Sequence, residues 1–241
     1  MAPPLPTRAY GGPRNAQTIT GLNRPDRVHV LNRAIQGVTL FEHPADYEAF
    51  FEILCDALRR FPIRLLAYCV MPNHWHLVVW PLDDTSLSPF MKWLTATHAR
   101  RWRDTRGNRG RGAVYQGRFK AIAVQHDAHF VRLCRYVERN SVRAKLVARA
   151  GEWAWSSASP LATGANRPVL ADWPVHRPDN WADLLDTPEP TESLREIRIA
   201  IRTGLHFGSA GWRVYTAETL GWRNGLRPPG KPAACDPTWS S

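Results

Sequence analysis

Two histidines separated by one residue form the most informative spacing in this sequence. His74 and His76 stand in residues 68–80, Tyr-Cys-Val-Met-Pro-Asn-His-Trp-His-Leu-Val-Val-Trp, a run rich in β-branched and aromatic side chains. That composition is typical of a β-strand, in which successive side chains alternate between two faces. We therefore expect both imidazoles on one face and Trp75 on the other. Two imidazoles so arranged can ligate one divalent metal ion, although this spacing alone is not specific.

Tyr136 and Asn140 form a second pair of chemically useful residues. They lie four residues apart in a segment with a helical apolar stripe, so their side chains are expected one turn apart on a neighbouring face. A phenol is a weak nucleophile at neutral pH because its pKa is about 10. A divalent cation nearby can favour its attack on a phosphate. Without such a cation, a half-buried tyrosine and a helix-ending asparagine are the simpler interpretation.

Composition and charge restrict the class of protein. The 241 residues are 44% hydrophobic and carry a net charge of +11 with a pI near 10.2. This length fits one main domain with an appendage, and the charge favours polyanions such as nucleic acid. No long apolar run and no amino-terminal signal segment occurs in the sequence. We therefore expect a cytoplasmic protein that does not engage a membrane.

A cluster of eight basic residues lies between the second predicted helix and the last predicted strand. The cluster consists of Arg100, Arg101, Arg103, Arg106, Arg109, Arg111, Arg118 and Lys120. Cations neutralise phosphates, and the aromatic rings of Trp102 and Tyr115 beside them can stack on unpaired bases. Because Asp104 is the one acid in the loop, we interpret the cluster as a DNA-binding surface rather than a solvated loop.

The elements that must position these residues follow from hydrophobic periodicity. Strands are predicted at 28–32, 63–70, 75–80 and 119–124, and helices at 44–60, 86–102 and, capped by Asp127, up to about 139. The order βαββαβ followed by a helix predicts an α+β fold. Its core is ferredoxin-like, with an antiparallel sheet, helices on one face, and a following helix that carries Tyr136.

The rest of the chain divides by composition. Residues 1–26 are predicted to be a flexible basic arm, and residues 27–159 the catalytic domain. Residues 160–190 are rich in Pro and Trp and indicate a linker. A small helical region is expected at 191–225, with helices near 192–203 and 210–220, and a disordered tail at 226–241.

Several of these segments resemble one known family. The run around His74 and His76 resembles the HUH motif, histidine–hydrophobic–histidine, of single-tyrosine HUH transposases. Residues 135–144, Arg-Tyr-Val-Glu-Arg-Asn-Ser-Val-Arg-Ala, resemble the tyrosine-bearing helix of the REP-associated tyrosine transposases. Residues 115–119 and 152–157 also resemble that branch, so the likeness spans about 28–159. The chain departs from the family at Ser141, where Pro is usual, and at Lys145, where Gly is common.

The resemblance implies a mechanism. His74 and His76 would hold Mg²⁺ or Mn²⁺ with Asn140 as the third ligand, and Tyr136 would attack a phosphorus of single-stranded DNA. The products would be a 5′-phosphotyrosine link and a free 3′-hydroxyl, which can later rejoin the strands. The DNA implied is a hairpin of a palindromic repeat with a flanking single strand. The branch favours a monomer and leaves a dimer open.

Other interpretations remain beside this one. A transposase-derived domain could bind DNA with little catalysis. A histidine-triad nucleotide hydrolase also has alternating histidines, but it needs a third histidine where Val78 stands. Tyr115 is a rival nucleophile without an amide one helical turn away. The remaining histidines, His29 and His98 among them, have no ligand partner by spacing and are expected to be structural.

Overall fold

A four-stranded antiparallel sheet forms the centre of the computed structural model, which describes residues 27–107, 112–125, 127–161 and 166–219. The expected arm and tail, together with Arg109 and Arg111, lie outside the described residues. The strands are β1 (Arg27–Arg33), β2 (Ile63–Met71), β3 (His74–Pro81) and β4 (Lys120–Val124). They are ordered β2-β3-β1-β4, and every neighbouring pair is antiparallel. With the chain order βαββαβ, this is the ferredoxin-like core that the sequence predicts.

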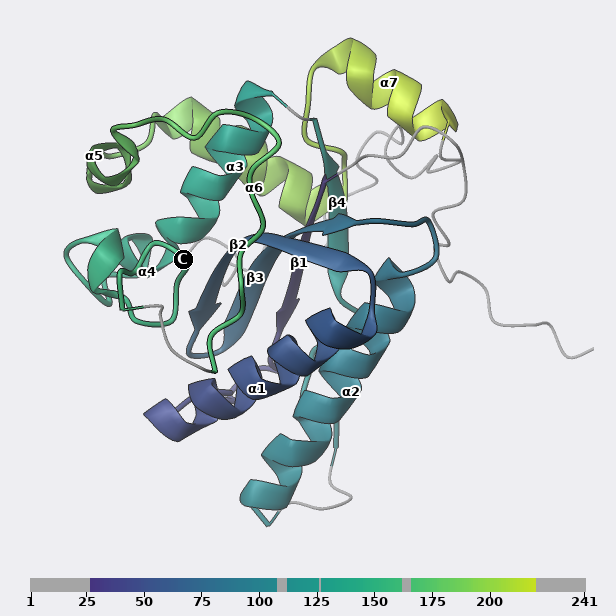
Figure 1. The fold of residues 1–241 in the computed structure, drawn as a ribbon, viewed down its shortest axis with the longest axis vertical. Helices are drawn as coiled ribbons and strands as arrows, with labels where there is room; N and C mark the ends of the chain where they lie inside the picture. The colour runs from purple at the N-terminus through teal and green to yellow at the C-terminus, as the bar shows by residue number, and fades with distance from the viewer. Residues whose placement is uncertain (1–26, 108–111, 126, 162–165, 220–241) are drawn as a thin grey trace, which may run out of the picture.

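Helices α1 (Pro44–Arg60) and α2 (Leu87–Thr105) pack side by side on one face of this sheet (Figure 1). Pro44 stands at the first helical position, where a missing N–H costs nothing. Phe50 and Leu54 of α1 are fully buried, and the ring of Phe50 lies 5.7 Å from that of Trp75 in β3. Trp75, the residue between the two histidines in the sequence, is therefore part of the apolar core under α1 and α2.

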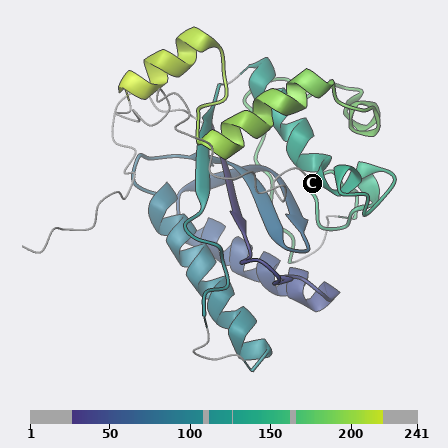
Figure 2. The ribbon, with the colours of Figure 1, turned by 180° about the vertical axis from the view of Figure 1, so that it is seen from behind.

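The opposite face of the sheet is covered by helix α3 (Ala128–Glu138), with α6 (Thr191–Thr203) beside it (Figure 2). The side chain of Asp127 accepts a hydrogen bond from the backbone N–H of His129 at 2.7 Å, so the expected cap is present. Leu133 and Val137 of α3 are buried in one cluster with Val78 of β3. The helix that carries Tyr136 therefore docks on the strand that carries the histidines.

The chain beyond α3 is more regular than the sequence suggests. Helix α4 (Asn140–Arg143), the 3₁₀ turn η1 (Ala150–Glu152) and helix α5 (Trp181–Asp186) are not among the predicted elements, whereas α6 and α7 (Ala210–Thr219) are. Because α3 ends at Glu138, Tyr136 and Asn140 lie on two consecutive helices rather than on one. None of the helices in the described ranges is long and apolar enough to span a membrane.

The segment between η1 and α6 lies against the sheet and α3. The indole N–H of Trp173 donates to the carbonyl oxygen of Leu66 in β2 at 3.0 Å. The indole N–H of Trp181 donates to the carboxylate of Glu138 at 2.7 Å. This segment, expected as a linker, thus contacts the strand and the helix next to the site. The division of the chain at residue 159 remains a prediction.

Candidate active site

Strands β1 and β3 present three imidazoles to the face covered by α3. His76 pairs with Leu31 and Val78 pairs with His29 in the antiparallel register, which makes His29 and His76 diagonal neighbours. His29 is fully buried, and His74 and His76 are 6% and 4% exposed. Trp75 points to the opposite face, as strand alternation predicts.

Each candidate histidine ligand is held through Nδ1. The Nδ1 atom of His74 lies 2.7 Å from Oδ1 of Asn73, and that of His76 lies 2.9 Å from Nε2 of His29. The rings of His29 and His76 are stacked, with centroids 5.1 Å apart and planes 14° apart. Among the described residues nothing is hydrogen-bonded to Nε2 of His74 or His76. Both atoms are therefore available to a ligand.

The three imidazoles are neutral at physiological pH. Burial lowers the pKa of His29 to about 3 and, with the guanidinium groups of Arg33 and Arg143, that of His74 to about 3. Burial, the neighbouring histidines and the same two guanidinium groups hold the pKa of His76 well below 6.5. Neutral imidazoles keep a nitrogen lone pair, which metal ligation requires.

Tyr136 lies over this histidine face. Its ring centroid is 6.2 Å from that of His76, with the rings edge to face at 87°. The tyrosine is 5% exposed. The sequence alone could not show that this helix docks against this strand, and the structure brings the phenol and the two histidines together.

Arg143 of α4 is the residue that joins Tyr136 to Asn140. Its guanidinium carbon lies 4.0 Å from the centroid of the Tyr136 ring. One of its nitrogens donates to Oδ1 of Asn140 at 2.8 Å, and the other donates to the carboxylate of Glu189 at 2.8 Å. Sequence reasoning missed Arg143, although it lies within the tyrosine-bearing segment. It also missed His29, whose partner is 47 residues away along the chain.

The donor atoms of this site fit a divalent metal ion. Two free Nε2 atoms and an amide oxygen are ligands that Mn²⁺ and Mg²⁺ accept. Oδ1 of Asn140 keeps a second lone pair beside the one that Arg143 uses, whereas Nδ2 of Asn140 is buried without a partner. In the described part of the chain, no group of three or more His, Cys, Asp or Glu residues could hold a metal.

Tyr115, the rival nucleophile, lies on the other face of the sheet. Its hydroxyl accepts a hydrogen bond from the indole N–H of Trp75 at 3.1 Å and lies 2.6 Å from Nδ1 of His98. Burial raises its pKa. The phenol of Tyr115 thus links Trp75 in β3 to His98 in α2. In that position it is poorly placed to attack a substrate.

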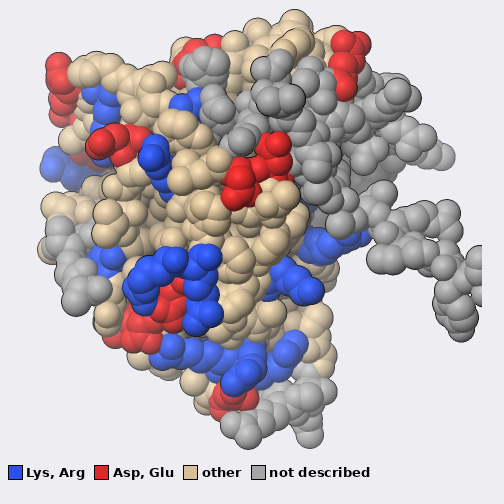
Figure 3. Space-filling model, turned by 45° about the vertical axis from the view of Figure 1, so that its right-hand side comes forward, with Lys and Arg blue, Asp and Glu red and all other residues tan. Residues whose placement is uncertain are grey.

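The basic cluster is partly neutralised by α1. Arg106 pairs with Asp46 through two hydrogen bonds of 3.2 and 3.0 Å, and Arg101 pairs with Glu52 at 2.7 Å. Besides Asp104, the one acid in the loop, helix packing thus brings two acids that are distant in the sequence to the cluster. Burial lowers the pKa of Lys120, whose ammonium group donates to the carbonyl oxygen of Ile201 at 3.3 Å. Figure 3 shows Lys and Arg side chains with Asp and Glu among them on the lower part of the molecule, where α1 and α2 lie in Figure 1.

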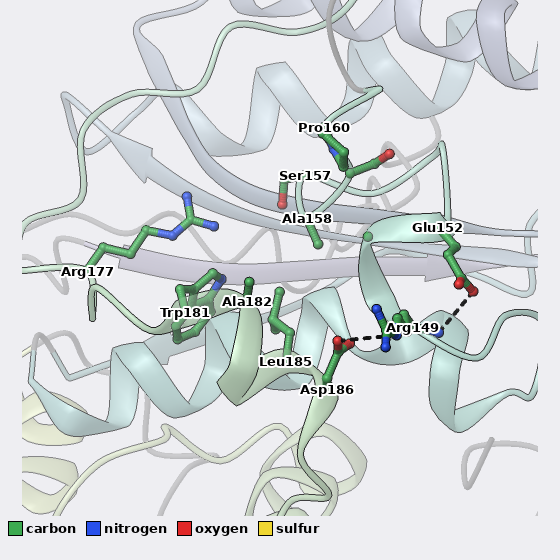
Figure 4. Close-up of a pocket in the computed structure, with 12 residues that line it drawn as sticks. Arg149, Glu152, Ser157, Ala158, Pro160, Arg177, Trp181, Ala182, Leu185 and Asp186 are labelled. Atoms are coloured by element: carbon green, nitrogen blue, oxygen red, sulfur yellow. Dashed lines mark hydrogen bonds and ion pairs between the residues drawn. The ribbon is translucent and has the colours of Figure 1, made fainter.

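A pocket of about 730 Å³ lies apart from the histidines, between η1, residues 157–160 and α5 (Figure 4). Arg149 and Arg177 stand on opposite sides of it, and none of His74, His76 and Tyr136 lines it. Two residues that line the pocket, Ser157 and Trp181, donate hydrogen bonds to the buried carboxylate of Glu138, at 2.6 Å and 2.7 Å. Burial raises the pKa of Glu138. This carboxylate therefore joins α3 to the segments that follow it.

Comparison with known proteins gives one family match. Residues 26–140 match the family model described as "Transposase IS200 like". None of the curated proteins matches the chain. A REP-associated tyrosine transposase bound to a REP hairpin is similar, with 18% identity, a TM-score of 0.45, and coverage of 54% of this chain and 74% of that one. A structure described as that of a transposase from Deinococcus radiodurans R1 has 18% identity, a TM-score of 0.37, and coverage of 55% and 95%.

Proposed function

Because residues 26–140 match the family model of the IS200-like transposases, a family of DNA-cutting enzymes, we propose that this chain nicks and rejoins single-stranded DNA with Tyr136 as the nucleophile. The observation that carries the proposal is the position of the Tyr136 ring, 6.2 Å from the ring of His76. A phenol next to two neutral, unengaged imidazole nitrogens is placed for attack on a phosphate held there.

The reaction forms one bond to phosphorus and breaks another. Oη of Tyr136 loses its proton and bonds to phosphorus, the bond from phosphorus to the 3′-oxygen breaks, and that oxygen gains a proton. The products are a 5′-phosphotyrosine link and a 3′-hydroxyl. Attack by a 3′-hydroxyl on the link reverses the step, so joining needs no external energy source.

His74, His76 and Asn140 would hold Mn²⁺ or Mg²⁺ in this proposal. When bound, such an ion supplies Lewis-acid polarisation of the scissile phosphate. The hydrogen bonds of Asn73 and His29 orient the two imidazoles, and the guanidinium of Arg143 orients the amide of Asn140. Since Tyr136, His74, His76 and Asn140 come from one chain, the proposed active unit is a monomer, with a dimer as the alternative.

The DNA is proposed to be a hairpin from a palindromic repeat with a flanking single strand. A single strand fits the chemistry, because an unpaired backbone reaches a side chain that is almost buried between a helix and a sheet more easily than a duplex does. Exposed basic side chains on the molecule favour the phosphate backbone of such DNA.

A covalent-adduct assay tests the nucleophile. Purified protein with Mn²⁺ and an end-labelled single-stranded hairpin oligonucleotide should yield a protein–DNA adduct that resists denaturation. Tyr136→Phe should abolish the adduct while hairpin binding persists. Tyr115→Phe is the matched control, because it removes the other candidate phenol and should leave the adduct intact. Adduct formation by Tyr136→Phe at the wild-type yield would show that the nucleophile lies elsewhere.

The alternative function, a DNA-binding domain with little catalysis, gives a different result in the same assay. It predicts hairpin binding without any adduct in the wild-type protein, at every concentration of Mn²⁺. The Nε2 atoms of His74 and His76, which have no hydrogen-bond partner among the described residues, favour the enzyme, because a domain that only binds DNA has no use for a pair of unengaged imidazole nitrogens.

A further inference from the structure

His29 is a buried imidazole in β1 that contacts the candidate metal site through a single neighbour. It is fully buried, and its Nε2 atom lies 2.9 Å from Nδ1 of His76. We propose that His29 is a positioning residue that fixes the tautomer and the ring orientation of His76 for ligation of a divalent metal ion. This role rests on the metal site proposed above, since it has a function only if His76 is a ligand.

The argument from tautomers starts at the free nitrogen of His76. A neutral imidazole that ligates a metal through Nε2 must carry its proton on Nδ1. That proton needs an acceptor, because Nδ1 of His76 lies in a buried environment. Nε2 of His29 is within hydrogen-bond distance of it and accepts the proton when His29 is protonated on Nδ1. With His29 in that form, the hydrogen bond holds His76 in the tautomer that has its lone pair on Nε2.

The same arrangement occurs at the other candidate ligand. Nδ1 of His74 lies 2.7 Å from Oδ1 of Asn73, an oxygen that can only accept. A partner on the second ring nitrogen is what metal-ligating histidines require for a fixed orientation. Asn73, just before β3, therefore orients His74 in the way that His29, in the neighbouring strand β1, orients His76.

The surroundings of His29 indicate that it acts through His76 and is not itself a ligand. Its Nε2 atom is engaged by His76, and its Nδ1 atom is buried without a hydrogen-bond partner. A buried polar atom without a partner destabilises a fold, so packing alone does not explain a histidine at this position. The parallel stacking on His76, with planes 14° apart, also restricts rotation of the ligand ring.

Direct measurement of Mn²⁺ affinity, without DNA, tests this role. Titration calorimetry on the full chain should show that His29→Phe, which keeps an aromatic ring but removes the acceptor, weakens Mn²⁺ binding about tenfold to hundredfold. His29→Gln should recover most of the affinity, because its amide oxygen reaches the place of Nε2. His29→Asn should not recover it, because its shorter amide reaches only the place of Nδ1.

His98→Phe is the matched control for loss of a buried histidine. His98 is 3% exposed, its pKa is lowered by burial to about 3, and its ring stacks on Phe41 on the other face of the sheet. This variant should bind Mn²⁺ like the wild type. If His29→Phe fails to fold, the Gln and Asn variants still decide, and equal affinities of these two would overturn the positioning role.

Two outcomes separate this role from the metal site on which it rests. Wild-type affinity in His29→Phe, together with weakened binding in His76→Ala, would overturn the role of His29 and leave the metal site standing. Unchanged Mn²⁺ binding in His76→Ala, or no binding by the wild type, would overturn the metal site and the role of His29 with it.

Discussion

Arg143 contacts two of the proposed catalytic groups, Tyr136 and Asn140. It lies on the ring of Tyr136, donates to the amide oxygen of Asn140 and to the main-chain carbonyl of Tyr136, and pairs with Glu189. Its side chain is 10% exposed and that of Glu189 is 4% exposed, so this ion pair is shielded from solvent. Arg143 therefore sets the relative positions of the nucleophile and of one proposed metal ligand.

The substitution Arg143→Lys should slow adduct formation while the chain stays folded. An ammonium group cannot stack on the ring and donate in two fixed directions as a planar guanidinium does. We expect the single-turnover rate of adduct formation to fall about tenfold to hundredfold, as on loss of other groups that orient metal ligands. Arg149→Lys is the control, because the side chain of Arg149 is exposed and its ion pair is with Asp186, at 3.8 Å, rather than with Tyr136 or Asn140. A wild-type rate in Arg143→Lys would mean that Arg143 does not position these groups.

The elements of the fold could be predicted wherever the apolar pattern is periodic. The helix at 44–60 is found with both ends as predicted, and the four strands are found within one residue of the predicted ends. Helices α4 and α5 were missed because four and six residues are too few for a helical stripe to emerge. Proximity of His29 to His76, and of Glu189 to Arg143, depends on strand register and loop path, which local periodicity does not encode.

Lys145 shows how one residue sets the end of the element that carries Asn140. Its φ is +57°, a left-handed conformation that an L side chain adopts at a cost. The backbone N–H of Leu146 donates to the carbonyl oxygen of Ser141, and that of Lys145 to that of Val142, which together form a Schellman end to α4. Glycine suits this position best, and the departure from glycine at Lys145 therefore stores strain in the turn.

The substitution Lys145→Gly should stabilise the protein by about 1 kcal/mol, because glycine adopts this backbone conformation without a Cβ clash. Urea unfolding at constant pH measures the change. Lys145→Ala is the matched control and should bring no such gain, since alanine keeps the Cβ. Equal unfolding free energies for the Gly and Ala variants would mean that the left-handed turn is not strained.

The net charge of the whole molecule does not show which of its cations are available to DNA. The chain carries +11, yet Asp46 and Glu52 of α1 already pair with two arginines of the predicted DNA-binding cluster. An arginine that is paired in the folded protein must give up that partner before it can neutralise a phosphate. Affinity for DNA therefore depends on which cations are unpaired rather than on their number. Among the residues described, the side chain of Arg100 is exposed and makes no hydrogen bond or ion pair.

The salt dependence of hairpin binding distinguishes arginines that are paired with an acid from arginines that are unpaired. Each phosphate contact contributes a slope of about −0.7 to −0.9 to the logarithm of the binding constant against the logarithm of salt concentration. Arg100→Ala should make this slope shallower by about that amount without changing stability. Arg106→Ala should leave the slope nearly unchanged and lower the free energy of unfolding by about 1–2 kcal/mol, because it leaves the partly buried carboxylate of Asp46 without its ion-pair partner.

Filter binding from 50 to 200 mM salt (roughly the range over which such slopes are large) measures the slope for each variant, and urea unfolding measures the change in stability. If both variants changed the slope equally, the ion pairs with α1 would not restrict which arginines reach the DNA.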